Sequence, residues 1–298
     1  MQTSQSADKS MTRGQLCDLF TRLFGCLFLS VVVPATSAAQ VDFYNTDAGR
    51  PLRIEDAYTI EHRGIEFQAA PLRVERSRTG AYAWGAEPRL EFGVLPRTQI
   101  DLGVPFVVTD VGGRTIAGAA GIDVAVLHNL NIETSIPALA VGLDVFLPAG
   151  AFGPTRTYVT ALGVVTRSFP SLGAVRVHAN VQYTFGERLA SGSSANIGSA
   201  IAGPQAQEVS RWLAGAAIDR TFPLRSTLVS AEVYARRPLE AGRAIEVSAG
   251  AGVRHQLTPR WALDGGVGRR LTGDEQAWYA TGGLAVAFGL HPFRKPGT

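Results

Sequence analysis

The chain has 298 residues, and its charged residues make up 18%, below the ~25% that is usual for soluble domains. The net charge is +3, but the only lysines are Lys9 and Lys295, and no basic run is present that would bind nucleic acid. Because the charge is low while the hydrophobic share is an ordinary 46%, the composition excludes both a disordered chain and a bundle of membrane-spanning helices.

The first 39 residues have the order of a secretory signal peptide. Arg13 and Arg22 precede the apolar run 23–33, which is shorter than the ~20 residues of a membrane-spanning helix. Small residues follow, and Ser37 and Ala39 occupy the positions that signal peptidase requires before a cut after residue 39. The alternative, a buried helix, does not explain this tail of small residues.

Both cysteines of the chain, Cys17 and Cys26, lie in this predicted signal peptide. A chain cleaved after residue 39 has no thiol, which excludes disulfide bonds, zinc bound by cysteine and a cysteine nucleophile. Cys26 lies inside the apolar run rather than after it, so we expect no lipid attachment at this residue.

From residue 62 onward, apolar and polar residues alternate with a period of two, the pattern of strands that have two different faces. Residues 40–61 are less regular and receive no assignment. The first run changes parity near Pro71, where we expect a bulge or a shifted strand start. The twelve predicted strands are longer than the ~5–6 residues typical of soluble strands and long enough for tilted membrane strands of ~9–11 residues. They cover residues 62–76, 80–94, 98–109, 118–129, 138–148, 157–169, 173–186, 208–220, 224–236, 244–257, 260–271 and 276–290.

The connections between these runs alternate in length. Short turns built on Pro96, Pro170, Pro223 and Pro259 alternate with longer connections rich in glycine and alanine, of which the longest is 186–207. An even number of strands with short turns at one end and long loops at the other is typical of an outer-membrane β-barrel. We therefore predict an all-β fold, a closed antiparallel transmembrane barrel of about twelve strands with up-and-down topology, with the proline turns in the periplasm and the 186–207 loop outside the cell.

Charged residues share one parity of the strands, which in a membrane barrel faces the lumen, because the lipid-facing side must be apolar. A soluble sandwich would instead bury its apolar parity, and periodicity alone does not separate the two folds. The signal peptide, the loop asymmetry and aromatic residues near the strand ends favour the barrel. The predicted lumen-lining residues are Glu87, Arg89, Glu91, Asp101, Asp123, Asp144, Arg167, Arg176, His178, Arg211, Asp219, Glu232, Arg236, Glu246, Arg254, Asp264 and Arg270.

These charges have two interpretations. They line a polar conduit that selects solutes, or they pair across strands, as Arg89 could with Asp101 and Arg254 with Asp264, and fill the lumen with an ionic core. The signs are balanced, so no anion or cation preference follows, and we favour structural pairing.

Residues 70–110, APLRVERSRTGAYAWGAEPRLEFGVLPRTQIDLGVPFVVTD, resemble the bacterial outer-membrane proteins named for the meta-pathway of phenol degradation and related transporter-like barrels. The remainder of the chain resembles them only in its strand pattern. The resemblance implies an outer-membrane barrel, of a kind sometimes proposed to pass small hydrophobic compounds, and it identifies no substrate. The matching positions are Trp84, Glu87, Pro88, Leu90, Phe92, Gly93, Arg97 and Pro105.

No constellation of residues indicates an enzyme, a metal site or a cofactor. The five histidines are scattered without metal-ligand spacing, and we assign His178, next to Asn180, to a hydrogen-bond network in the lumen. The serines cluster in 191–199 without a nearby histidine, and no GxSxG motif is present. Glycines in the strands are interpreted as room for neighbouring inward charges or as bends, not as phosphate-binding loops.

The sequence therefore predicts a signal peptide (1–39), an N-terminal segment (40–61), a barrel (62–290) and a C-terminal tail (291–298). The expected function is passive or facilitated passage of a small solute through the bacterial outer membrane. The alternative is a non-conducting structural or surface-binding barrel with a lumen closed by salt bridges, and a catalytic role is disfavoured. The expected partners are outer-membrane lipid and lipopolysaccharide, the barrel-assembly machinery and an unidentified small solute, with no nucleic acid and a monomeric state.

Overall fold

The structure is a computed structural model that describes most of the chain between residues 44 and 289. The predicted signal peptide and C-terminal tail lie outside the described residues, as does most of the 186–207 loop. The described ranges are 44–46, 50–69, 72–78, 80, 82–111, 114–154, 156–188, 209–274 and 276–289.

The described residues form sixteen strand segments and two 3-10 turns, η1 (Pro170–Leu172) and η3 (Pro223–Arg225). No helix in this part of the chain is long and apolar enough to cross a membrane. The first four predicted strands are each divided into two segments, so the sixteen segments make twelve strands. The segments are β1 (Gly64–Gln68), β2 (Leu72–Ser77), β3 (Tyr82–Ala86), β4 (Arg89–Leu95), β5 (Thr98–Gly103), β6 (Phe106–Val111), β7 (Arg114–Ala119), β8 (Ile122–Asn129), β9 (Ala138–Leu147), β10 (Tyr158–Phe169), β11 (Val175–Phe185), β12 (Ser210–Phe222), β13 (Thr227–Pro238), β14 (Glu246–Thr258), β15 (Trp261–Arg270) and β16 (Ala277–Gly289).

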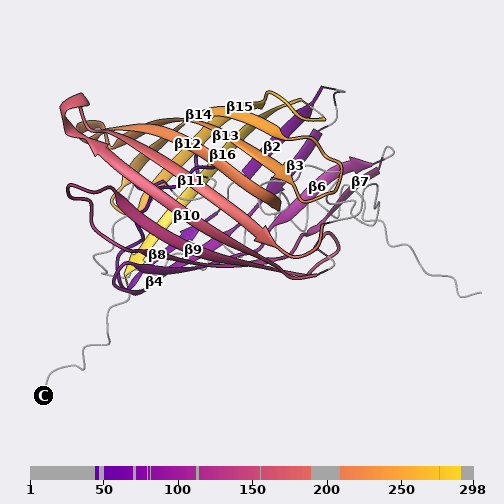
Figure 1. Cartoon of the computed structure of the whole chain (residues 1–298), viewed down its shortest axis with the longest axis horizontal. Helices are drawn as coiled ribbons and strands as arrows, with labels where there is room; N and C mark the ends of the chain where they lie inside the picture. The colour runs from indigo at the N-terminus through magenta and orange to yellow at the C-terminus, as the bar shows by residue number, and fades with distance from the viewer. Residues whose placement is uncertain are drawn as a thin grey trace, which may run out of the picture.

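Neighbouring strands are antiparallel and follow one another around the sheet in chain order. The sheet closes because the first strand pairs with the last one, Ile65 of β1 lying opposite Phe288 and Val74 of β2 opposite Ala280. Figure 1 shows the resulting barrel from the side. The predicted closed, twelve-stranded, up-and-down barrel is confirmed.

The interruptions of the first four strands lie on one line across the sheet. Arg89 of β4 is opposite both Gln68 and Gly103, while on the other side of the line Ala86 of β3 is opposite both Leu72 and Phe106. Gln68 is opposite Ala285 and Leu72 is opposite Gly282, so the chain has one more residue between these pairs than β16 has. The expectation near Pro71 was a bulge or a shifted strand start, and Pro71 itself lies outside the described residues. In Figure 1 the halves β2, β3, β6 and β7 lie together at one end of the barrel.

The distribution of polarity is inverted relative to a soluble protein. Apolar side chains are exposed on the outer face, such as Val181 (62%) and Leu143 (49%), while charged side chains such as Glu91 and Arg254 are only 1% exposed. In water this arrangement would be unfavourable, because it exposes apolar area and buries charge. In a bilayer it is the required arrangement, since lipid covers the apolar face and the polar face lines the lumen.

Two of the proline turns have the same construction. A 3-10 turn begins at Pro170 or Pro223, and a left-handed residue follows, Gly173 (φ 77°) or Ser226 (φ 45°), whose N–H donates to the proline carbonyl oxygen. These tight turns lie at the end of the barrel opposite the longer connections 148–157, 186–209, 239–245 and 271–276.

Candidate functional site: the barrel lumen

The described residues between 44 and 60, here called the lumen segment, lie inside the barrel. The sequence pattern predicted no structure for this part of the chain. Its described residues form no strand that joins the barrel sheet. Arg50, Ile54 and Ala57 are almost completely buried, although they precede the first strand of the barrel. The barrel is therefore filled in part by its own N-terminal residues.

An extended backbone buried in this way needs hydrogen-bond partners for its N–H and C=O groups. Inward side chains from at least six strands of the wall supply them. The contacts are Ile60 N to Gln99 Oε1 (2.9 Å), Asn129 Nδ2 to Ala57 O (2.7 Å), Ala57 N to Thr166 Oγ1 (2.9 Å), Glu55 N to Asn180 Oδ1 (2.8 Å), Ile54 N to Glu232 Oε2 (2.9 Å) and Thr281 Oγ1 to Pro51 O (3.0 Å).

Two of these wall residues each make two bonds to the segment. The amide of Asn180 accepts from the N–H of Glu55 and donates to its carbonyl oxygen at 2.9 Å, as a neighbouring strand would. Glu232 Oε2 accepts from Ile54 N and also from Arg53 N at 2.8 Å. These bonds fix the position of the segment along the wall, because each pairs one named residue of the segment with one named side chain.

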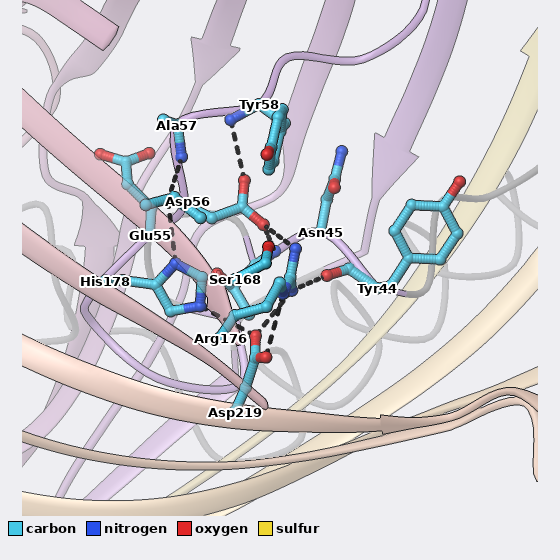
Figure 2. Close-up of polar contacts among 12 residues, drawn as sticks. Tyr44, Asn45, Glu55, Asp56, Ala57, Tyr58, Ser168, Arg176, His178 and Asp219 are labelled. Atoms are coloured by element: carbon cyan, nitrogen blue, oxygen red, sulfur yellow. Dashed lines mark hydrogen bonds and ion pairs between the residues drawn. The ribbon is translucent and has the colours of Figure 1, made fainter. Parts of the chain in front are cut away.

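Arg176 on β11 connects the lumen segment to the wall by charge, as Figure 2 shows. Its Nη2 lies 2.6 Å from Asp219 Oδ2, its Nη1 lies 3.1 Å from Asp56 Oδ2, and it also donates to the carbonyl oxygen of Tyr44. His178 lies beside this pair, with Nε2 3.0 Å from Asp219 Oδ2 and Nδ1 3.0 Å from Thr166 Oγ1. The hydrogen-bond network predicted around His178 is confirmed, and it includes the segment.

Arg50 forms a second charged contact between the segment and the wall. Its Nη2 lies 2.7 Å from Asp264 Oδ2 on β15, and its Nη1 lies 3.5 Å from Glu66 Oε1 on β1. Arg254 is directly opposite Asp264 in the sheet, as the sequence predicted, but the ion pair that the structure shows for Asp264 is with Arg50. Arg254 instead donates to the carbonyl oxygen of Asn45. The lumen charges thus pair with the segment as well as with one another.

The segment also packs against small residues on the inner face. Ile54 clusters with Leu213 and Tyr234, and a Cβ added to Gly215 would come within 2.7 Å of its Cδ1 atom. A Cβ added to Gly252 would lie 2.7 Å from Cβ of Pro51. These inward glycines make room for the segment. Gly103 and Gly283 make room for the carboxylates of Glu87 and Asp264, as predicted for strand glycines.

Tyr58 connects the segment to the turn between β8 and β9. Its hydroxyl donates to Glu133 Oε2 at 3.4 Å, and Glu133 also accepts from Ser168 N (2.8 Å) and Ser168 Oγ (2.7 Å). Burial, followed by the carboxylates of Glu133 and Asp56, raises the pKa of Tyr58 to about 12, so the hydroxyl keeps its proton. Burial acts to raise the pKa of Glu133, but the hydrogen bonds from Ser168 and the charge of Arg167 outweigh it and hold that pKa below its usual value.

Sixteen of the seventeen predicted lumen residues face inward. Fifteen of them lie on strands, and Glu87 lies in the break between β3 and β4. Arg167 does not face inward. Thr166 beside it is fully buried and contacts the lumen segment, so Arg167 lies on the outer face and reaches Glu133 and the carbonyl oxygen of Thr134 in the turn. The prediction for Arg167 was wrong because both faces of the 157–169 run carry apolar and small residues, which leaves its parity ambiguous.

The pairing of Arg89 also differs from the expectation. Its Nη2 lies 2.6 Å from Glu87 Oε1 and 3.1 Å from Asp123 Oδ2, whereas a pair with Asp101 was predicted. Apart from Asn180, which was noted beside His178, the neutral inward residues that hold the segment were not among the predicted lumen residues, because charged side chains were used to identify the lumen face. Their parity is the signal that could have found them, since they alternate with the apolar residues as the charges do. They are Gln99, Asn129, Thr166, Asn180 and Thr281.

Within the described ranges, no group of three or more histidine, cysteine or acidic side chains is arranged to hold a metal ion. His128 and His255, which the sequence left without a role, each place Nδ1 2.9 Å from a threonine hydroxyl on the neighbouring strand, in Thr98 and Thr227. These contacts join adjacent strands near the tight turns.

No protein-family model and no curated protein matches the chain. Among solved structures, the chain is similar to the COG4313 outer membrane channel from Pseudomonas putida F1, with a TM-score of 0.51 and 12% identity, covering 78% of this chain and 98% of that one. It also matches the KdgM porin (TM-score 0.47, 10% identity, 76% of this chain and 99% of that one) and the NanC porin (0.46, 10%, 74% and 98%). The similarity to the Pseudomonas putida channel shows the fold, that of an outer-membrane barrel.

Proposed function

We propose that this protein lets a small solute cross the bacterial outer membrane, and that the lumen segment closes its passage in the conformation described. The observation that carries the proposal is the occupant of the lumen. A barrel with a purely structural role can fill its interior with side chains from its own wall. Here the interior is built instead around a separate piece of chain, held largely by hydrogen bonds and ion pairs to named wall residues.

A segment held in this way is suited to move. Besides the apolar packing of Ile54, most of the contacts described above are polar bonds that water can replace once the lumen is hydrated. The net strength of each neutral hydrogen bond is modest, about 0.5–1.5 kcal/mol. Residues 61–63 join the segment to β1, and this covalent link would keep the segment close to the lumen when it is displaced. Closed and open states would then be two populations whose ratio depends on the bonds to the wall.

The class of solute and the cellular setting belong to the same proposal. The resemblance of residues 70–110 to the family named for phenol degradation favours small hydrophobic compounds. We propose that the protein is exported through a signal peptide cleaved after residue 39 and inserted by the barrel-assembly machinery. It would then function as a monomer surrounded by lipid.

Single-channel recordings on the refolded full chain in planar bilayers test the proposal. Gly252→Leu places a side chain where Pro51 lies, so it should displace the segment and raise the mean current above that of the wild type. Gly163→Leu is the matched control, because a Cβ at Gly163 has no neighbour within 4 Å and the residue faces outward. This control should conduct like the wild type. Phenol added to the bath should reduce the Gly252→Leu current if such compounds enter the lumen.

The alternative is a non-conducting barrel, and the burial of Arg50, Ile54 and Ala57 in the lumen is the observation that favours it. A chain with residues 40–58 deleted separates the two functions, provided that heat-modifiable mobility on gels shows that it folds. If this chain passes no more current than the wild type, the wall itself closes the lumen and the passage function is wrong.

A further inference from the structure

A row of arginine and aromatic side chains lies on the outer face of the barrel, near the end that carries the long connections. Trp278 of β16 is directly opposite Arg269 of β15 and Arg76 of β2, and Arg76 is in turn opposite Tyr82 of β3. All four side chains are exposed, Trp278 by 60%. Four neighbouring strands therefore present cations and aromatic rings at one height of the wall.

The row borders a hollow of about 570 Å³ in the surface. Its lining residues are Arg76, Arg78, Arg269, Gln276, Ala277 and Trp278. Three guanidinium groups thus face one concave site, which is large enough for a phosphate group together with part of a sugar ring.

Two of the three guanidinium groups of this hollow, those of Arg76 and Arg269, are held in place but keep donors free. The Arg269 guanidinium carbon lies 5.1 Å from the centre of the Trp278 ring, and that of Arg76 lies 5.6 Å from the centre of the Tyr82 ring. Stacking on a ring orients the plane of a guanidinium while its N–H groups point outward from the edge. The hydrogen bond of Arg269 Nη2 to Gln276 Oε1, at 3.3 Å, uses a neutral acceptor.

The contrast with the inward arginines on the same strands shows that no described carboxylate compensates the charge of the hollow. Arg270, next to Arg269, contacts Glu246 at 3.1 Å and Glu75 at 3.3 Å. In the part of the chain that the structure describes, no carboxylate forms an ion pair with Arg76, Arg78 or Arg269. Three cations that share a hollow without an anion repel one another, so a bound anion would stabilise them.

We infer that this hollow binds a phosphate group of lipopolysaccharide in the outer leaflet, with Arg76, Arg78 and Arg269 donating to the phosphate oxygens and Trp278 and Tyr82 packing beside its sugar and acyl groups. Guanidinium groups bind phosphate in bidentate fashion, and exposed tryptophan and tyrosine rings mark the level of the membrane interface. Long loops face outward in outer-membrane barrels, which places the hollow at the outer leaflet. The inference rests on the outer-membrane setting proposed above, but not on conduction.

Binding of purified lipids to the full chain in detergent, followed by native mass spectrometry, tests the inference. The wild type should bind lipid A with both phosphates more tightly than dephosphorylated lipid A. Replacing all three arginines with glutamine should weaken binding of the phosphorylated lipid by about tenfold or more, the size of one lost charged hydrogen bond or more. Arg220→Gln is the matched control, because Arg220 stacks on Phe222 at 5.0 Å but lies near a tight turn at the opposite end. This control should bind like the wild type.

Three outcomes would overturn the inference. The first is undiminished binding of phosphorylated lipid A by the triple variant. Because the triple variant could fail to fold, binding is also measured on Arg269→Lys, a single change that keeps the charge. The second is competition by millimolar inorganic phosphate as strong as that of the lipid, which would make the hollow a site for free anions. The third is labelling of Ser171→Cys but not Asp274→Cys by an impermeant thiol reagent in intact cells, which would place the hollow in the periplasm. Bilayer current measured on the triple variant tests conduction separately.

Discussion

Replacing Asn180 with leucine should release the lumen segment without unfolding the barrel. Asn180 faces inward from β11, and its amide satisfies both the N–H and the carbonyl oxygen of Glu55, at 2.8 and 2.9 Å. Leucine has nearly the same volume and removes no charge, so the change deletes the two hydrogen bonds and little else. Both backbone groups of Glu55 then stay buried without a partner for as long as the segment remains in place.

The size of the effect follows from these two groups. Each buried and unsatisfied backbone group costs about 1–3 kcal/mol, so the closed state should lose about 2–6 kcal/mol relative to a state in which water reaches the segment. Since every ~1.4 kcal/mol is a factor of ten, even the lower value raises the displaced population about thirtyfold. The barrel strands lose no bond to one another, so their unfolding temperature should change little.

The rate at which a thiol at Ala57 is labelled measures this population. Ala57 is fully buried in the lumen and the described residues contain no cysteine, so Ala57→Cys is labelled by an impermeant maleimide only when the segment moves. Asn180→Leu in this background should raise the rate about thirtyfold or more. Val181→Leu, on the adjacent outward position, should leave it unchanged. Equal rates in all three chains would refute the view that hydrogen bonds to the wall hold the segment closed.

Three further changes test the wall and its turns. Leu143→Arg, on the lipid-facing side of β9, should lower the free energy of unfolding in bilayers by about 2–4 kcal/mol, whereas Leu143→Ala should cost less. Arg89→Ala should lower it by about 3–5 kcal/mol, because Glu87 loses the buried cation that it contacts at 2.6 Å; an effect of about 0–1 kcal/mol would mean an exposed pair. The pKa of Glu133 is lowered in the folded protein. Its contribution to the free energy of unfolding is therefore complete above the unfolded pKa of ~4.3 and is lost as the pH falls through the lower folded pKa. The difference in unfolding free energy between the wild type and Glu133→Gln should therefore shrink in acid, and Ser168→Ala should move this loss to a higher pH.

The wall of the barrel could be predicted from the sequence because its signal is local. In a strand, neighbouring side chains point to opposite faces, so Val141 and Leu143 on one parity and Asp144 on the other already separate lipid from lumen. The proline turns and the extra residue near Pro71 are equally local, since a missing N–H or an extra residue affects only the adjoining ladder.

Which side chains meet in the lumen was decided by tertiary structure. Closure of the sheet brings Asp264 and Arg176 toward an interior whose occupant comes from residues 44–60, and no periodicity links those parts of the chain. The segment has no regular pattern because its hydrogen bonds go to side chains of the wall rather than to a neighbouring strand. Arg167 shows the same limit within one strand, because where both parities are apolar or small, only the register with Ala138 and His178 at Thr166 determines which face is inside. Alternation along a strand is set by backbone geometry at each residue, whereas the filling of a barrel depends on contacts that exist only once the sheet has closed.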